Sequence, residues 1–331
     1  MLVRAAAYLP TGTFSGRRVA GPDEDPFTMI ATALERVRDP IPSAAGPTTL
    51  EILTELPEAY DPGLGAVLGG EVRCLRPGGP APPPGPSVHL VVAAEGPDPP
   101  VADRSDPGPG DGAVALLYRP TSEAAGGETP ERLRSGPHAV RRAFVFYRED
   151  PGAEQIEWAG DWSADPANGR PVDPGPAAAY RNLPPGGISQ GAYVPRPRYL
   201  EGLASHWRFE GERCPRCATV TFPARGVCRN CGRREGLVPV TLPRDDLEVV
   251  ATTTIGAGGQ PTEFDREVEA FGPYEVVLAE LAPGVRVTLP VSDAAAGSVR
   301  IGDRVDTRLR RLYPMDGEWR YGRKAVPRSP G

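Results

Sequence analysis

Four cysteines in two closely spaced pairs are the residues of this sequence with the clearest chemistry. Cys214 and Cys217 enclose Pro-Arg, and after ten further residues Cys228 and Cys231 enclose Arg-Asn. Two such pairs can place four thiolates tetrahedrally around one zinc ion. A site closed by four protein ligands has no open coordination position, so its zinc stabilises the fold. The pattern therefore predicts a structural metal centre, with a catalytic or redox zinc as the less favoured interpretation.

A fifth cysteine, Cys74, is the one candidate for a catalytic nucleophile. A thiolate that attacks a substrate needs a helix N-terminus and a basic partner to lower the pKa of its thiol. Residues 76–86, which follow, are rich in proline and glycine and cannot build such a helix. We therefore expect Cys74 to be a buried or surface thiol without a catalytic role. The alternative is a stand-alone enzyme that uses Cys74, and it fails if iodoacetamide alkylates Cys74 no faster than a free thiol.

Arginine is concentrated in the second half of the chain. Residues 1–195 hold 16 arginines and 25 acidic residues, a net charge of −9, whereas residues 196–331 hold 20 arginines, Lys324 and 18 acidic residues, a net charge of +3. An arginine cluster can bind the phosphates of coenzyme A, a nucleic acid or an acidic protein surface, or it can form a solvated face. The arginines around the four cysteines are Arg208, Arg213, Arg216, Arg225, Arg229, Arg233 and Arg234.

Length and composition indicate a folded protein with two domains. With 331 residues the chain is long enough for two cores, and its 42 prolines and 40 glycines indicate long irregular stretches. No apolar run approaches the length of a membrane span, and Pro10 interrupts the N-terminal apolar stretch before a signal core could form. Because four of the five cysteines belong to the metal site, we expect no disulfide framework and a cytoplasmic protein without a membrane partner.

The elements that must position these residues are divided by a proline- and glycine-rich linker at 161–198. A short helix at 199–207 is expected to lead into the cysteine pairs. Beyond them, short apolar runs separated by glycine turns indicate five strands, and this number of short strands favours a small closed barrel, with the OB-fold as the candidate. The expected strands are 247–254, 274–281, 285–291, 304–312 and 319–326.

The second half of the chain resembles a known family. Phe222-Pro223-Ala224-Arg225 lies between the cysteine pairs, and Pro273-Tyr274-Glu275-Val276-Val277 and Ile301-Gly302-Asp303-Arg304-Val305 follow in the expected barrel. Together these motifs look like the zinc-ribbon/OB-fold acyl-CoA-associated family over residues 196–328. The resemblance implies a zinc ribbon, an OB-fold barrel and a protein that helps a thiolase-type enzyme to hold an acyl-CoA.

The first half of the chain carries four further motif segments, at 7–10, 21–29, 87–94 and 110–117. The first two are similar to the start of bacterial hydroxymethylglutaryl-CoA synthases, and the last two resemble segments of the thiolase superfamily. Asp23, Glu24 and Asp25 are expected to cap a helix that runs to about Val37. The resemblance implies a truncated thiolase-like domain, because the half of that fold that supplies the active-site histidine is missing. An ordinary α/β core is the alternative.

These observations predict an accessory subunit and not an enzyme that acts alone. The expected segments are a truncated thiolase-like α/β domain at 1–160, the linker at 161–198, a helix and zinc ribbon at 199–236 and an OB-fold barrel at 237–328. Arg225, Arg229 and Arg233 are the candidates for binding a coenzyme A thioester, which a thiolase-fold partner would condense, transfer or cleave. A nucleic-acid-binding module is a further interpretation, but the net charge of −6 and the few barrel aromatics weigh against it.

Overall fold

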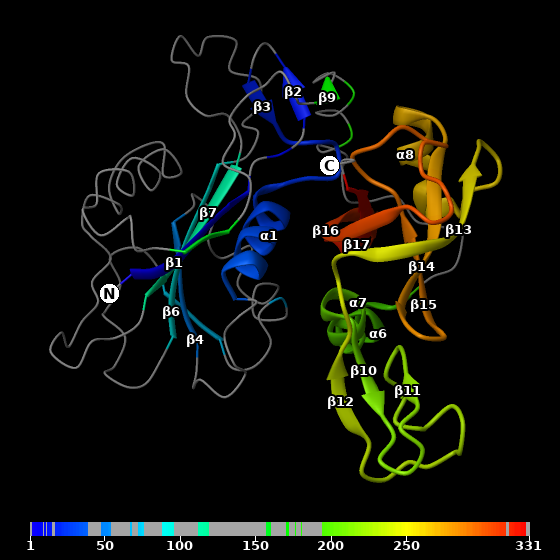
Figure 1. The fold of residues 1–331 in the computed structure, drawn as a ribbon. Helices are drawn as coiled ribbons and strands as arrows, with labels where there is room; N and C mark the ends of the chain where they lie inside the picture. Colours follow the sequence, from blue (N-terminus) through cyan, green and yellow to red (C-terminus); the bar gives the residue numbers. More distant parts are fainter. Residues whose placement is uncertain are drawn as a thin grey trace, which may run out of the picture. The chain divides into compact units, whose positions relative to one another are not determined.

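The structure, a computed structural model, divides the chain into two compact units, Met1–Pro174 and Gly175–Gly331 (Figure 1). Each unit is described by itself. The residues that the structure describes are 2–8, 10, 12–14, 17–38, 48–53, 67, 72–75, 88–95, 112–118, 157–159, 170–171, 176, 180, 194–315 and 318–328.

A six-stranded mixed sheet forms the centre of the first unit, in the order β5-β4-β6-β7-β1-β8. β4 runs parallel to β5 and β6, β7 runs antiparallel to β6 and β1, and β8 runs parallel to β1. A smaller sheet joins β2, β3 and β9. The strands are β1 (Leu2–Tyr8), β2 (Gly12–Phe14), β3 (Arg17–Val19), β4 (Thr48–Leu53), β5 (Val72–Leu75), β6 (Val88–Glu95), β7 (Gly112–Tyr118), β8 (Glu157–Ala159) and β9 (Arg170–Pro171).

Helix α1 (Pro26–Arg38) packs against β1, β6 and β7 of this sheet. Asp25 is its N-cap: the Asp25 carboxylate accepts a hydrogen bond from the Thr28 N–H at 2.8 Å, and the Thr28 hydroxyl accepts one from the Asp25 N–H at 2.9 Å. Met29 and Leu34 of the helix are fully buried. The helix expected from the acidic cap is therefore confirmed. The relation of this unit to the thiolase fold stays a prediction.

Two short helices, α6 (Arg196–Glu201) and α7 (Leu203–Arg208), stand where a single helix was predicted. The break falls at Gly202, whose N–H donates to the carbonyls of Arg198 and Tyr199 at 3.1 Å each and closes α6. A Cβ at Gly202 would lie 2.7 Å from Cδ2 of the exposed His206 side chain, which would have to move to admit a larger residue. Among the described residues, no helix is long and apolar enough to cross a membrane.

A three-stranded antiparallel sheet, here called the ribbon sheet, follows α7. β10 lies at its centre, between β11 and β12. Its strands are β10 (Glu210–Arg213), β11 (Val220–Thr221) and β12 (Val238–Thr241).

The rest of the second unit is a five-stranded sheet in the order β15-β14-β13-β16-β17, with every neighbouring pair antiparallel. Val291, just beyond β15, forms a parallel bridge with Ala325 of β17, so the two ends of the sheet meet. The five strands predicted from the apolar runs are all present. They are β13 (Leu247–Ile255), β14 (Tyr274–Ala282), β15 (Val285–Pro290), β16 (Arg304–Met315) and β17 (Glu318–Pro327), with η4 (Thr262–Phe264) and α8 (Asp265–Phe271) between β13 and β14.

One hydrophobic core serves both the ribbon sheet and the five-stranded sheet. Phe209 before β10 and Leu242 after β12 are buried in the same cluster as Val277 and Leu289 of the larger sheet. Phe222 packs on that cluster, with its ring 5.7 Å from the Phe209 ring in an edge-to-face contact. The metal-site region is therefore fixed to the larger sheet by shared apolar packing.

Candidate metal centre

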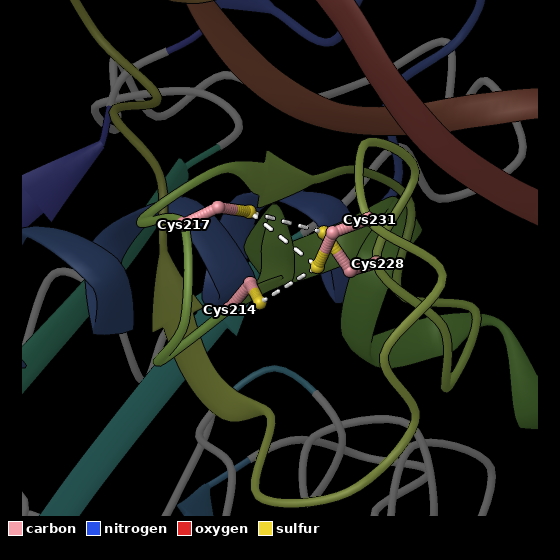
Figure 2. Close-up of side chains that lie close together, drawn as sticks. All are labelled: Cys214, Cys217, Cys228 and Cys231. Atoms are coloured by element: carbon pink, nitrogen blue, oxygen red, sulfur yellow. Dashed lines mark hydrogen bonds between the residues drawn. The ribbon is translucent and has the colours of Figure 1, made fainter.

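The four cysteine sulfur atoms lie together beside the ribbon sheet (Figure 2). All four lie within 4.8 Å of one another. The Sγ atoms of Cys214 and Cys231 are 3.6 Å apart, those of Cys217 and Cys228 are 3.6 Å apart, and those of Cys217 and Cys231 are 3.7 Å apart. Sulfur ligands at the corners of a tetrahedron, each 2.3 Å from a zinc ion, lie about 3.8 Å apart. The cysteines are therefore positioned to bind one tetrahedral metal ion.

The two cysteine pairs are built as matching turns. The N–H of Ala218 donates to the Cys214 carbonyl at 2.9 Å, and the N–H of Gly232 donates to the Cys228 carbonyl at 3.0 Å. Ala218 and Gly232 both adopt the left-handed conformation, with φ of 57° and 71°. Each turn thereby brings its two sulfur atoms to the same side of the chain. Glycine takes this conformation without steric cost, whereas Ala218 does not.

The sulfur atoms have contrasting acidities in the absence of a cation. Hydrogen bonding to the side chain and main chain of Thr219 lowers the pKa of Cys217 to about 6. The N–H of Arg233 lowers the pKa of Cys231, but burial and the neighbouring sulfur atoms outweigh it and raise that pKa to about 11. Four adjacent thiolates repel one another, so a divalent cation is what allows all four cysteines to lose their protons together.

The centre is a closed site. Cys214 and Cys228 are buried, and Cys217 and Cys231 are partly exposed. With four protein ligands, a bound metal has no position for a substrate or an activated water. What the arrangement can do is hold the ribbon together.

The three arginines proposed for coenzyme A are all exposed, and they make different contacts. Arg229 and Arg233 each donate to main-chain carbonyls, Arg233 through Nε to Glu235 at 2.7 Å. Arg225 uses its N–H, which donates to the Glu212 carboxylate at 3.1 Å. Its guanidinium makes no hydrogen bond or ion pair with any other residue that the structure describes. Coenzyme A binding by these residues stays a prediction.

Cys74 lies in strand β5, where it pairs with Leu50 of β4. Its side chain and the segment 76–86 lie outside the described residues. The expected lack of a catalytic role stays a prediction.

Several buried charged residues were not singled out as structurally important from the sequence, and Glu275 and Lys324 are two of them. Glu275 of β14 is 2% exposed, and its carboxylate accepts hydrogen bonds from the N–H groups of Gly297 and Val299 at 3.0 and 3.2 Å. Lys324 of β17 is 1% exposed, and its Nζ is 3.0 Å from Glu267 Oε1 of α8. The only sequence signal was a charged residue inside an apolar strand, because the partners are distant in the chain.

Comparisons with known proteins agree with the metal site. Residues 204–236 match the family model described as "ChsH2, rubredoxin-like zinc ribbon domain". A DUF35 domain-containing scaffold protein of Methanothermobacter thermautotrophicus is 30% identical over 129 residues, which are 38% of this chain and 92% of that relative. A DUF35 domain-containing scaffold protein of Methanocaldococcus jannaschii is 30% identical over 119 residues, which are 35% of this chain and 79% of that relative.

Two solved structures are similar to parts of the chain, with low TM-scores. One is described as "Ltp2-ChsH2(DUF35) aldolase"; it is 22% identical, with 41% of this chain and 98% of that chain covered, and the TM-score is 0.31. The other is PksG, an HMG-CoA synthase from Bacillus subtilis; it is 18% identical, with 35% of this chain and 38% of that chain covered, and the TM-score is 0.26. At these scores neither similarity adds to the description of the fold.

Proposed function

Because this chain belongs to the family of DUF35 domain-containing scaffold proteins, we propose that it is a noncatalytic accessory subunit of a thiolase-type acyl-CoA complex. The observation that carries the proposal is the extent of the family match, which takes in 92% of a relative named as a scaffold protein. The closed four-cysteine centre supports it, since such a site stabilises a fold and leaves no position for a reacting group.

We further propose that the second unit is a zinc ribbon followed by an OB-fold barrel. Zinc is supported by the sulfur separations of 3.6–3.7 Å and by the match to a zinc ribbon model. The barrel is supported by the strand order β15-β14-β13-β16-β17 and by the Val291–Ala325 bridge, which brings the first and last strands together as a five-stranded barrel requires.

The first unit is proposed as the docking domain. In this proposal residues 1–160 are a truncated thiolase-like domain that pairs with a complete thiolase-fold protein, and residues 161–198 link it to the ribbon. The mixed sheet and the helix capped by Asp25 support the proposal, because β6 and β7 lie on two of the segments on which the sequence resemblance rests and α1 begins within a third. The partner carries out the reaction on the thioester, and both proteins act in the cytoplasm.

Coenzyme A is the proposed shared ligand, held by Arg225, Arg229 and Arg233. A guanidinium has five N–H donors, so an arginine that donates to one carbonyl keeps donors for a phosphate group. Arg225 is the residue whose guanidinium has no other contact among the described residues, and it supports the proposal best.

The partner proposal is tested by co-purification. We propose to express the full chain with and without a thiolase-type protein encoded beside it, and to measure complex formation by size-exclusion chromatography and thioester turnover by thiol release. The expected result is one heteromeric complex that turns over acyl-CoA and a lone chain that does not. The Cys74→Ala variant should retain the activity of the complex. A lone chain that is stable, active and inactivated by Cys74→Ala would establish the stand-alone enzyme instead.

The ligand proposal has a separate test. Calorimetry of coenzyme A binding to the complex should show roughly tenfold weaker binding for Arg225→Ala, the loss expected for one charge-assisted contact. Arg266→Ala is the matched control, because Arg266 is exposed and pairs only with Glu269 on its own helix among the described residues. Equal affinities for the two variants would exclude Arg225 from the site.

A further inference from the structure

Arg229 lies within the second metal-binding turn and reaches the five-stranded sheet. It is enclosed by two of the four cysteines, Cys228 and Cys231. Its Nη1 and Nη2 atoms both donate to the carbonyl oxygen of Gly284, at 3.2 Å each. Gly284 lies 55 residues later, in the turn that joins β14 to β15. One side chain therefore connects the metal centre directly to a strand-joining turn of the neighbouring sheet.

The β14–β15 turn is shaped to receive this side chain. Gly284 has φ of +70°, a conformation that favours glycine, and its N–H donates to Glu280 Oε1 at 3.0 Å. Glu280 also lies 3.9 Å from Arg286 Nε on the other strand of the hairpin. With its N–H bound to Glu280 and its carbonyl bound to Arg229, Gly284 has both main-chain polar groups satisfied by side chains.

The main chain of Arg229, by contrast, is held next to the metal ligands. Its N–H donates to the hydroxyl of the buried Thr221 of β11 at 3.1 Å. Arg229 and Asn230 are both exposed, so little packing holds this turn in place. A metal ion that binds Cys228 and Cys231 fixes the main chain on either side of Arg229 and hence the origin of its side chain.

We propose that Arg229 is a positioning residue that transmits the metal state of the ribbon to the β14–β15 turn. With metal bound, Arg229 is held in place and its two hydrogen bonds order Gly284. Without metal, the Cys228–Cys231 turn loosens, these bonds are lost, and the β14–β15 turn exchanges with solvent more readily. This inference requires a metal in the four-cysteine centre and does not depend on the proposed partner or on coenzyme A.

The shared hydrophobic core offers a second route between the two regions, which the experiment must separate from the first. Phe209 and Phe222 join the ribbon to the larger sheet without Arg229. Loss of metal could loosen the whole sheet through this packing. Coupling through Arg229 predicts that bound metal slows solvent exchange locally, at the β14–β15 turn. This dependence on metal should disappear when Arg229 alone is replaced.

Hydrogen–deuterium exchange of the full chain, read by mass spectrometry, tests the proposal. The chain is loaded with zinc or stripped with a chelator, and its metal content is measured in each state. Exchange is followed in a peptide covering residues 280–286 and in a reference peptide from β16, residues 304–312. The variants are Arg229→Ala, Arg229→Lys and the matched control Arg225→Ala, which removes a ribbon arginine without a guanidinium contact among the described residues.

In the parent chain, stripping the metal should speed exchange in 280–286 roughly tenfold or more, because a hydrogen bond from a charged donor is lost, and should affect 304–312 much less. Arg229→Ala should show the fast exchange even with metal bound, and Arg229→Lys should lie between the two. Arg225→Ala should behave as the parent chain.

The proposal is overturned if metal-loaded Arg229→Ala protects 280–286 as the parent does, or if stripping loosens both peptides equally in every variant. If Arg229→Ala binds no zinc, Arg229→Lys in its metal-loaded form decides between these outcomes.

Discussion

The phenol of Tyr199 and the main chain of Tyr321 form a reciprocal pair of hydrogen bonds. The Tyr199 hydroxyl donates to the Tyr321 carbonyl at 3.1 Å and accepts from the Tyr321 N–H at 2.9 Å. The indole N–H of Trp207 donates to the same carbonyl at 3.0 Å. Side chains of α6 and α7 thus satisfy the main chain of β17 at this position, as a neighbouring strand would.

Replacing Tyr199 by phenylalanine is expected to destabilise the second unit by about 1–3 kcal/mol, because it removes the hydroxyl that bonds both main-chain groups of the half-buried Tyr321. Tyr274→Phe is the matched control, since no hydrogen bond of its hydroxyl is found among the described residues. Urea unfolding followed by circular dichroism measures both variants. An equal loss of unfolding free energy in the two variants would show that the reciprocal pair of hydrogen bonds contributes nothing to stability.

The same tyrosine predicts a loss of stability at alkaline pH. Burial raises the pKa of Tyr199 to about 12, against an ordinary value near 10. The unfolded chain therefore ionises this phenol first, and the stability held at lower pH is lost between about pH 10 and 12. Over that range the free energy of unfolding should fall less steeply in Tyr199→Phe than in the parent chain. Parallel curves of unfolding free energy against pH for the two proteins would contradict the raised pKa of Tyr199.

Removal of the metal is expected to destabilise the ribbon. A metal present at 1,000 times its dissociation constant adds about 4 kcal/mol of stability to the folded state. The parent chain and Cys74→Ser should each hold one equivalent of zinc, measured by colorimetric release, and Cys228→Ser should hold less and melt at a lower temperature. Full zinc content in Cys228→Ser would remove that cysteine from the ligand set.

Lys324 should resist acylation in the folded protein. It is the only lysine of the chain, it is 1% exposed, and its ammonium group is paired with Glu267. An amine-reactive acetyl ester should leave Lys324 unmodified in buffer and modify it in urea, as read by peptide mass. Glu267→Gln should speed the reaction in buffer, because the lysine side chain loses the ion pair that holds it against α8. Rapid labelling of the native parent chain would show that this strand opens easily.

Glu275 should be required for the order of the segment after β15. Its carboxylate accepts hydrogen bonds from Gly297, Val299 and the Thr252 hydroxyl. Glu275→Gln is expected to cost about 1–3 kcal/mol, since an amide cannot accept all three. Glu269→Gln, at an exposed position on α8, should change stability by less than about 0.5 kcal/mol. Similar losses in both variants would reject the role of Glu275.

The local features of this fold could be predicted from the sequence, and the long-range ones could not. The strands β13–β17 follow short apolar runs bounded by turn glycines, and the metal ligands follow from the spacing of Cys214, Cys217, Cys228 and Cys231. The helix expected at 199–207 was wrong as a single element, because the Gly202 N–H closes α6 on the carbonyls of Arg198 and Tyr199 and a second helix, α7, begins after it. The contact of Arg229 with Gly284 joins residues that only the folded chain brings together.

The shared core of the ribbon and the larger sheet sets a rule for building chimaeras. A splice at residue 237 separates Leu242 from the Phe209 carbonyl, which accepts the Leu242 N–H at 2.9 Å, and leaves buried phenylalanine and leucine side chains exposed on both fragments. Exposed apolar surface of that kind promotes aggregation. A splice at residue 175, where the second unit begins, keeps these contacts in one fragment together with the buried Tyr180, whose ring packs on Phe271 and Trp319. The segment to transfer is therefore the whole of residues 175–328, and the four-cysteine portion should not be moved alone.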